Sequence, residues 1–414
     1  MGLFDKLFGA PSKNRFARML SAAIRKAGER AAIRYDPEEF RLIVEGEEKR
    51  FFNLSNIYRE YCAGPLAGRP RALRHYVRSW FANRKRIPAE FEDVRPDLLP
   101  AVRTRCSFEM ARLKAQIDGL PSPEWPHYVV ADHLTVSLVY ILPQAIVQVQ
   151  QQHLWDWHYS LEEALDVACG NLRKISDRQW DNPCPGVWIS PWRDNHDAAR
   201  LVLTDLLQAH PVKGNYVAMV PNRDTLIIAG SEDEASLAHM AMFAEKALKH
   251  GRPMTGLAFL LDNETWLPWL PDAGHPLRDR FTLLQLRSFG RDYAAQKELL
   301  DAFHGKAGGK IWVASYSAVK NNETGMSHSY CVWSRGVDTL LPKADQVYFF
   351  VSTGENEGSV VAKASWDRVQ QVVGHLMEAQ ELYPMRYRVR VFPAAEQLAA
   401  LGGDLIVPLD PNVH

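Results

Sequence analysis

The chain has 414 residues, of which 46% are hydrophobic and 24% charged, the composition of an ordinary globular protein. This length exceeds one comfortable hydrophobic core, so two or three domains are expected. Lysine plus arginine and aspartate plus glutamate number 49 each, which excludes a global field that steers the chain to nucleic acid or membrane and leaves only local patches for such roles.

The cysteines and the apolar runs indicate the compartment. Five cysteines are far apart and form no CxxC pair, so neither a zinc site nor a disulfide framework is predicted. No apolar run reaches the roughly 20 residues of a membrane-spanning helix, and the first residues lack a signal-peptide pattern. We expect a cytoplasmic protein in a reducing compartment, without a transmembrane segment, metal or cofactor.

The first third of the chain is predicted to be mainly helical. Residues 1–11 form a short apolar segment with Leu3, Phe4, Leu7 and Phe8, which is either a core staple or a loose anchor. Helices are predicted at about 13–28, from Ser55 onwards, at 71–83 and at 107–117, from apolar residues at helical spacing. Residues 40–54 alternate around Glu45 and Gly46, which predicts a hairpin.

Strands and capped helices alternate in the next part. Strands are predicted at 127–130, 135–142 and 145–149, which are rich in β-branched and aromatic residues. Ser160 and Glu163 have capping-box spacing and open a helix that runs to about 175. A helix from about Asp197, a hairpin of 216–219 with 225–228, and a helix at 234–250 follow, and a linker near 269 closes the first domain.

The remainder has a different order of elements. A helix is predicted at 297–303, strands at 311–319, 329–333, 346–352, 359–362 and 387–392, a turn at 321–325, and a helix from the cap Ser365 to about 382. This order favours an antiparallel sheet with one packing helix. Its aromatic residues alternate, so one face packs under the helix, and the other is either an exposed binding surface or covered by residues 1–270.

The predicted fold class is therefore α+β. Residues 12–270 form a domain of mixed helices and short antiparallel sheets, 278–393 form a smaller C-terminal α+β domain, and 394–414 are a tail.

An ordered set of segments resembles a known family. The segments are FNLSNIYREY (52–61), VVADHLTVSLVYILPQAIVQV (129–149), SLEEALDVACGNLRK (160–174), HDAARLVL (196–203) and NYVAMVPNRDTLIIAG (215–230). In this order they resemble the YtpQ-like family, a bacterial family whose function is not established. The resemblance covers roughly 12–270 and implies a bacterial, intracellular α+β protein. It offers no catalytic residue, and residues 275–414 have no counterpart in it.

One polar cluster coincides with two predicted elements. It comprises Asp194, His196, Asp197 and Arg200 at a helix start and Asn222, Arg223 and Asp224 at a hairpin turn. A helix N-terminus can hold an anion, and His196 could act as a general base if Asp194 or Asp224 orients it. The structural interpretation is favoured, in which Asp197 caps the helix, Asn222 and Asp224 stabilise the turn, and Arg200 pairs with a carboxylate to brace helix against hairpin.

A second candidate site is the basic segment 67–87. It has seven basic residues, among them Arg71, Arg74 and Arg78, and no acidic residue lies between Tyr61 and Ala89. Interleaved aromatics such as Trp80 could stack on bases while the cations hold phosphates. Trp80 also falls on the apolar helical face, where it would be core, and the arginines would then form a solvated face or contact an acidic protein partner.

Three further motifs are weaker. His153 and His158 are five residues apart, and no third metal ligand is implied. The segment 305–310 lacks the spacing and the Ser or Thr of a phosphate-binding loop. Ser327, His328 and Ser329 have no acidic partner nearby in the sequence.

The leading hypothesis is a non-enzymatic interaction or binding protein with a protein partner. The alternative is a hydrolase-type enzyme or small-anion binder centred on His196, Asp197 and Asp224. A third hypothesis is nucleic-acid binding through 67–87.

Overall fold

The computed structural model describes residues 10–45, 50–82, 87–142, 145–250, 252–306, 308, 311–320, 327–354 and 357–402. The chain forms two compact units. The first comprises residues 1–101, 137–177 and 249–253, and the second comprises 102–136, 178–248 and 254–414. The boundaries of these units differ from the predicted domain ranges 12–270 and 278–393. Those ranges stay predictions about which parts of the chain fold independently.

The first unit contains a three-stranded antiparallel sheet packed with helices. The sheet has the order β1 (Ala32–Asp36), β2 (Arg41–Glu45), β3 (Arg50–Asn53). Its helices are α2 (Lys13–Lys26), α3 (Ser55–Ala63) and α4 (Arg69–Ala82), with the 3-10 turn η1 (Leu66–Gly68) before α4. Phe16, Leu20 and Ile24 of α2 recur at helical spacing and are fully buried in the shared core. The Ser12 hydroxyl begins α2 by accepting a hydrogen bond from the Arg15 amide.

Shorter elements complete the first unit. They are α5 (Phe91–Val94), η2 (Arg95–Asp97), β7 (Ala145–Gln148), α7 (Gln151–Trp157) and α8 (Leu161–Lys174). The Ser160 and Glu163 side chains form the predicted capping box at the start of α8, with bonds of 2.8 and 3.2 Å. The chain passes between the units within β4 (Leu98–Thr104) and within β6 (Leu134–Leu142), which belong to one sheet with β5 (His127–Val130) and β7.

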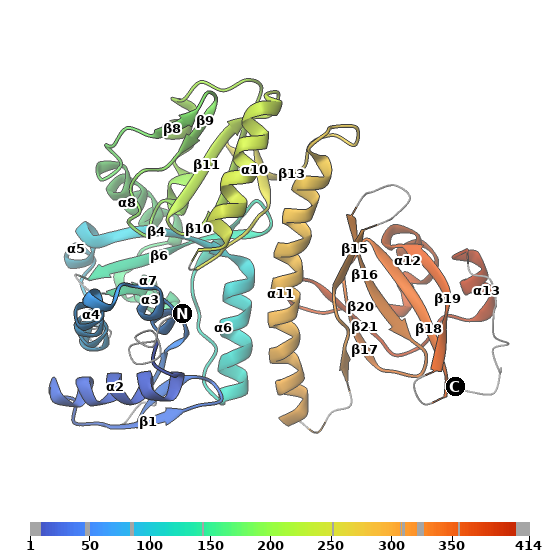
Figure 1. Ribbon diagram of the computed structural model, residues 1–414, viewed down its shortest axis with the longest axis horizontal. Coiled ribbons are helices and arrows are strands. Elements are labelled where there is room, and N and C mark those ends of the chain that lie inside the picture. The colour runs from blue at the N-terminus through green and yellow to red at the C-terminus, as the bar shows by residue number, and fades with distance from the viewer. Residues whose placement is uncertain are drawn as a thin grey trace, which may run out of the picture. The chain divides into compact units, whose positions relative to one another are not determined.

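The second unit includes a six-stranded antiparallel sheet. Its order is β13 (Thr265–Trp269), β12 (Ala258–Asp262), β10 (Tyr216–Asn222), β11 (Thr225–Gly230), β9 (Val187–Ile189), β8 (Asp181–Cys184). Helix α10 (Glu234–Leu248) lies across β10 and β11 (Figure 1). Gly230 ends β11 where only glycine fits, because an added Cβ would lie 2.1 Å from the Lys213 carbonyl oxygen.

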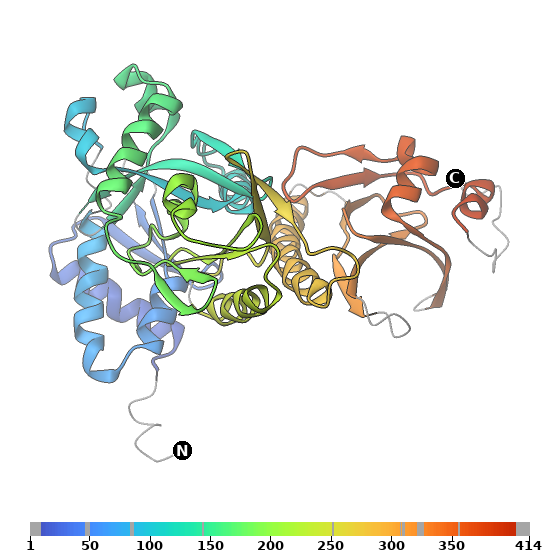
Figure 2. The ribbon, with the colours of Figure 1, turned by 90° about the horizontal axis from the view of Figure 1, so that it is seen from above.

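Two four-stranded sheets follow in the same unit. One has the order β14 (Trp312–Val313), β17 (Thr339–Pro342), β21 (Arg386–Val389), β20 (Glu378–Ala379). The other has the order β15 (Ser317–Lys320), β16 (Ser327–Ser334), β18 (Gln346–Gly354), β19 (Glu357–Ser365). Two neighbouring pairs, β14 with β17 and β16 with β18, are parallel. Helices α12 (Trp366–Val373) and α13 (Ala395–Ala400), with η4 (Gly374–Leu376) after α12, lie against β19 (Figure 2).

The long helix α11 (Arg278–Lys306) packs against α6 (Arg105–Asp118) and against strands of both four-stranded sheets. Arg386 of β21, which is fully buried, holds α11 against these sheets. The Arg386 guanidinium donates to the Tyr293 carbonyl and the Gln296 side chain of α11, and to the carbonyls of Ala314 and Leu340 at the sheets. Burial lowers the pKa of Arg386 to about 10, so it stays charged at neutral pH.

The α+β fold class is confirmed. The structure also confirms α2, the β2–β3 and β10–β11 hairpins, strands β5 to β7 and helices α8 and α10, within a few residues of the predicted ends. The apolar segment Leu3–Phe8 and the turn 321–325 lie outside the described residues.

Several predicted elements near the C-terminus are wrong in extent. The helix predicted at 297–303 is the end of the 29-residue α11. The buried residues of α11 face several different elements, so they do not recur at one helical spacing along a single side. The single strand predicted at 311–319 is two strands, β14 and β15, in different sheets. The Ser365 cap is confirmed, but the helix it opens changes to a 3-10 turn at Gly374 rather than running to 382.

Replacing Arg386 by Met should lower the free energy of unfolding by about 3 kcal/mol or more, because four buried oxygens each lose a hydrogen bond. Urea denaturation followed by circular dichroism measures this. The control is Arg388→Met on the same strand, which breaks the partly exposed Arg388–Asp338 pair (2.7 Å) and should cost no more than about 1 kcal/mol. Equal losses in the two variants would contradict the anchoring role of Arg386.

Candidate functional site

The predicted cluster of residues 194–200 and 222–224 does come together, around the 3-10 helix η3 (Ala198–Val202) and the β10–β11 turn. Arg200 is fully buried and pairs with both carboxylate oxygens of Asp194, at 3.0 and 2.8 Å. Its guanidinium carbon lies 3.9 Å from the centre of the Trp192 ring. The predicted pairing of Arg200 with a carboxylate is therefore confirmed.

Backbone contacts join this loop to the hairpin. The Asn195 amide donates to the Asp224 carboxylate (2.8 Å), and the Ala198 amide donates to the Arg223 carbonyl (3.1 Å). The Asn222 side chain accepts from the Asp224 amide and donates to the Ala247 carbonyl at the end of α10. Asp224 and Asn222 thus stabilise the turn, as the structural interpretation expects.

The helix predicted from Asp197 is wrong. The structure has η3 and then the short helix α9 (Thr204–Gln208), and the Asp197 side chain makes no capping bond. Instead its carboxylate accepts from the Asp194 amide (3.2 Å), because the chain before it folds back through left-handed residues at Arg193 and Asn195. Asp197 holds the loop rather than the helix.

Two carboxyls of this cluster, those of Asp194 and Asp197, have pKa values that move in opposite directions. Burial raises the pKa of Asp197, which a hydrogen bond from Ser190 offsets only in part. Burial also acts on Asp194, but the hydrogen bonds and charge of Arg200 outweigh it and lower the Asp194 pKa. His196 is only 5% exposed, so a substrate cannot reach its ring without movement of the loop. A catalytic role for His196 and Asp224 stays a prediction.

The basic segment forms the outer face of α4. Arg71, Arg74 and Arg78 are exposed, whereas Trp80 is 4% exposed and donates from its indole nitrogen to Glu29 (2.8 Å). Trp80 is therefore a core residue and cannot stack on a base, which corrects its assignment to a binding surface. Lys85 and its basic neighbours at 84 and 86 lie outside the described residues.

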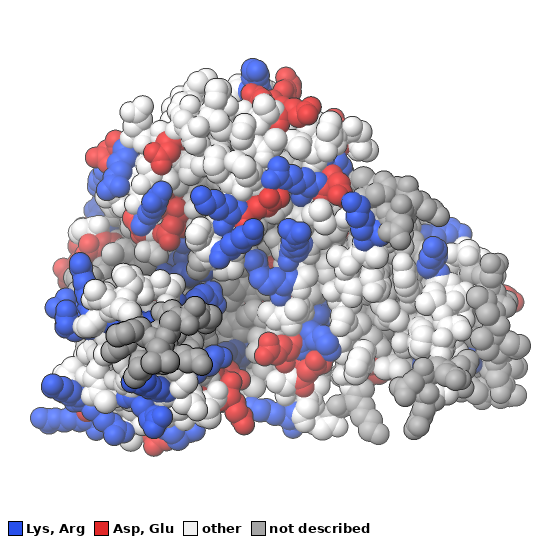
Figure 3. All heavy atoms as spheres, viewed as in Figure 1, with Lys and Arg blue, Asp and Glu red and all other residues white. Residues whose placement is uncertain are grey.

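Helix α2, which packs against α4, carries exposed cations of its own. Neither helix contains an acidic residue. We call the exposed cations of the two helices the basic face: Lys13, Arg15, Arg18, Arg25, Lys26, Arg71, Arg74 and Arg78. In the part of the chain that the structure describes, none of them forms an ion pair, and blue side chains gather over α2 in Figure 3. The sequence alone does not show that α2 lies beside α4.

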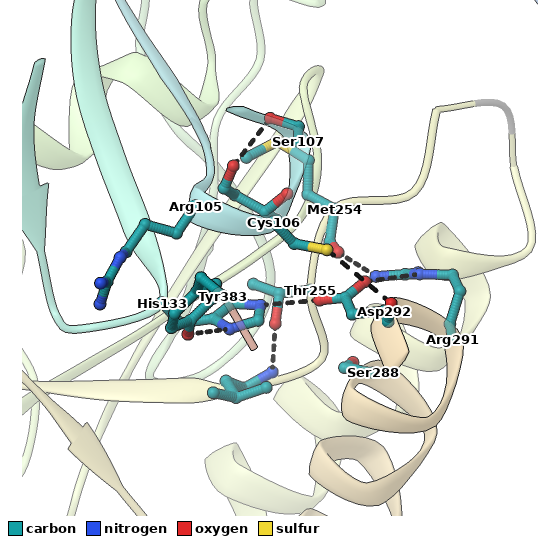
Figure 4. Close-up of polar contacts among 12 residues, drawn as sticks. Arg105, Cys106, Ser107, His133, Met254, Thr255, Ser288, Arg291, Asp292 and Tyr383 are labelled. Carbon is teal, nitrogen blue, oxygen red and sulfur yellow. Dashed lines mark hydrogen bonds and ion pairs between the residues drawn. The ribbon is translucent and has the colours of Figure 1, made fainter. Parts of the chain in front are cut away.

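The structure also brings together three residues that the sequence analysis missed: His133, Asp292 and Tyr383 (Figure 4). His133 lies in the β5–β6 turn, Asp292 on α11 and Tyr383 in the loop after β20. The Tyr383 hydroxyl is 2.9 Å from Nδ1 of His133, and Nε2 of His133 is 3.5 Å from the Asp292 carboxylate. No sequence signal links them, because 159 and 91 residues separate them in turn.

The turn that carries His133 is built to hold it. Ala131 and Asp132 both adopt left-handed backbone angles, and the His133 carbonyl accepts from the Arg105 amide at the start of α6 (2.9 Å). The Arg105 guanidinium lies over the Tyr383 ring at 4.1 Å. Backbone and cation–π contacts thus fix both ends of the Tyr383–His133 bond.

The pKa values of His133 and Asp292 decide which of these buried side chains carries a proton. Burial, with the charges of Arg291 and Arg105, lowers the pKa of His133 to about 3, so the ring is neutral. Burial raises the pKa of Asp292 to about 6, although Arg291 opposes this. Below that pH the Asp292 carboxyl can donate to Nε2, and above it Nε2–H faces the carboxylate while the Tyr383 hydroxyl donates to Nδ1.

A nucleophile beside these three residues is not open to a substrate. The nearby Cys106 thiol is buried, and burial, with the charge of Asp292, raises its pKa far above the ordinary value. A protonated, buried thiol is inert. His133 itself is 1% exposed, so the three residues form a buried polar cluster rather than an open catalytic site.

The weaker motifs have structural roles. His153 accepts from the Gln150 amide at the start of α7 (2.9 Å). Ser329 has an acidic partner after all, since its hydroxyl donates to Asp345, which is close in space through the β16–β18 pairing (2.7 Å). Among the described residues, no group of three or more His, Cys, Asp or Glu side chains is placed to hold a metal ion.

Comparisons with protein-family models, with curated proteins and with solved structures found no match for this chain. Membership of the YtpQ-like family therefore stays a prediction. Within the described ranges no helix has the length and apolar character needed to cross a membrane.

Replacing Asp292 by Asn should change how stability depends on pH. A carboxyl with a folded pKa of about 6 and an unfolded value near 3.9 contributes stability that is complete below about pH 4 and lost as the pH rises through 6. Relative to the wild type, the variant should therefore gain up to about 3 kcal/mol between pH 4 and pH 8. Urea unfolding at a series of pH values measures the difference.

The control for this test is Asp338→Asn. Hydrogen bonding and the charge of Arg388 lower the pKa of Asp338, so its contribution is present at neutral pH and lost in acid, with the opposite sign. A wild-type to Asp292→Asn difference that is constant from pH 4 to pH 8 would show that Asp292 has an ordinary pKa.

Proposed function

We propose that this chain is a non-enzymatic, cytoplasmic bacterial binding protein that holds an acidic protein partner on the basic face of α2 and α4. The observation that carries the proposal is the set of eight exposed cations on two adjacent helices that lack any acidic residue. Such a surface repels cations and attracts a complementary acidic surface, which raises the rate and the specificity of association.

The arrangement of the exposed arginines on α4 supports a docking role. Arg71, Arg74 and Arg78 recur at spacings of three and four, which places them on one side of α4, opposite the buried Tyr76 and Trp80. Because the apolar side of the helix is already in the core, the arginines are not needed to hold the fold. Their mutation should therefore affect binding rather than folding.

A protein partner is favoured over nucleic acid by the position of the aromatics. Recognition of single strands combines cations with aromatic rings on which bases stack. Two rings of this segment, Tyr76 and Trp80, are 5% and 4% exposed and belong to the core, and the third, Phe81, is partly buried against the same core. The basic face therefore supplies charge without a stacking surface, and nucleic-acid binding remains the alternative that the experiment must exclude.

Charge reversal by Arg74→Glu with Arg78→Glu should leave the unfolding transition unchanged and weaken the partner complex about tenfold or more, since attraction becomes repulsion at two sites. The complex is purified from source cells with the full chain under native conditions, its partner identified by mass spectrometry and its affinity measured by titration of the purified components. The complex should survive nuclease treatment and weaken as salt is raised.

The matched control is Arg178→Glu with Lys246→Glu, which reverses two exposed charges outside the basic face. It should bind the partner as the wild type does. An unaltered complex in the Arg74 and Arg78 variant would contradict the proposal, and a complex that nuclease dissolves would favour nucleic-acid binding.

A further inference from the structure

A groove of about 380 Å³ lies along α11 in the second unit. One wall is a face of α11 with Tyr293, Lys297, Glu298 and Asp301, and the other is Ser315 and Tyr316 in the segment that joins β14 to β15. This volume is within the range of small-molecule sites.

The aromatic groups of the groove are fixed in place. The Tyr293 and Tyr316 rings stack with their centres 4.9 Å apart and their planes 20° apart. Tyr293 is held from behind, because its carbonyl accepts from Arg386 and its hydroxyl donates to the Met385 carbonyl (2.8 Å). Trp312 lies beside the groove residue Lys297, whose ammonium is 4.9 Å from the centre of its ring, and is 60% exposed.

The charges of the groove leave an excess of one negative charge. The Lys297 ammonium is occupied by the Asp301 carboxylate (2.9 Å), the Val313 carbonyl (2.7 Å) and the Trp312 ring (4.9 Å). Glu298 is exposed, and in the part of the chain that the structure describes it forms no ion pair. The groove therefore presents one uncompensated carboxylate beside fixed aromatic rings.

We infer that this groove binds a small organic cation, an amine or guanidinium compound with a flat or apolar portion. The cationic group pairs with Glu298, and the apolar portion lies against Tyr316 and the α11 backbone. Aromatic faces and a carboxylate both attract such a cation, whereas an anion would have to displace Asp301 and a carbonyl from Lys297. The site is separate from the basic face and does not depend on its function.

Two probes of nearly equal shape and opposite charge test the inference: 2-phenylethylamine and 3-phenylpropionate. Each is titrated into the full-length protein at neutral pH and followed by calorimetry and by the indole resonance of Trp312, assigned with a Trp312→Phe variant. The amine should bind and shift the Trp312 resonance, and the carboxylate should do neither at the same concentration.

Replacing Glu298 by Gln should weaken binding of the amine about fivefold, the size expected for one exposed ion pair. Glu264→Gln, an exposed glutamate in the β12–β13 turn, should leave it unchanged. If 3-phenylpropionate binds more tightly than the amine, and Lys297→Met abolishes that binding, the inference is overturned in favour of an anion site. Absence of binding by the amine up to millimolar concentration, or equal binding to wild type and Glu298→Gln, would overturn it as well.

Discussion

In the part of the chain that the structure describes, a buried guanidinium that donates to uncharged oxygens holds α11 in place. Arg386 has four recorded acceptors, and all are uncharged oxygens, three of them backbone carbonyls that come from α11, from the segment after β14 and from β17. Carbonyl oxygens that accept from one planar donor must converge on it, so the arginine fixes the distance between helix and sheets in a way that apolar contacts alone would not. Asp292, which faces His133, and the α11 wall of the groove both belong to this helix.

Arg200 is the contrasting case in the same unit. It is equally buried, but it pairs with the carboxylate of Asp194 and lies against the Trp192 ring, and it organises a loop rather than a helix. Both arginines are satisfied within the fold, whereas the cations of α2 and α4 face outwards. Buried and exposed arginines thus differ by what surrounds them, and only the exposed ones are available to another molecule.

The sequence was informative where one local pattern decides the structure. Ser160 and Glu163 determine the start of α8, β-branched and aromatic residues favour β5 and β6, and the spacing of Phe16, Leu20 and Ile24 determines α2. The sequence was not informative where a helix or strand is defined by the elements that pack against it. Helix α11 is buried on several sides by different elements, and β14 is a two-residue strand that exists because it lies beside β17. No local period encodes either.

The candidate sites divide in the same way. The pairing of Arg200 was predictable, because its partner is six residues away, and so was the burial of Trp80, because it shares a helical face with Leu73 and Val77. The contacts of His133 with Asp292 and Tyr383 were not, since these residues meet only through the turn, the helix and the loop that carry them. The contribution of α2 to the basic face was likewise hidden until its packing against α4 was known.

The separation of these contacts along the chain bears on the order in which the protein folds during synthesis. All segments of the first unit have been made once residue 253 is complete, but Arg386 follows 133 residues later. At roughly 5–20 residues per second the ribosome needs about 7–27 s to cover that stretch. Over that stretch His133 waits for Asp292 and Tyr383, and Gln296 and the carbonyls of Ala314 and Leu340 are made before the arginine that will bind them. The buried polar contacts of the second unit can therefore close only after nearly all of its described residues have been synthesised.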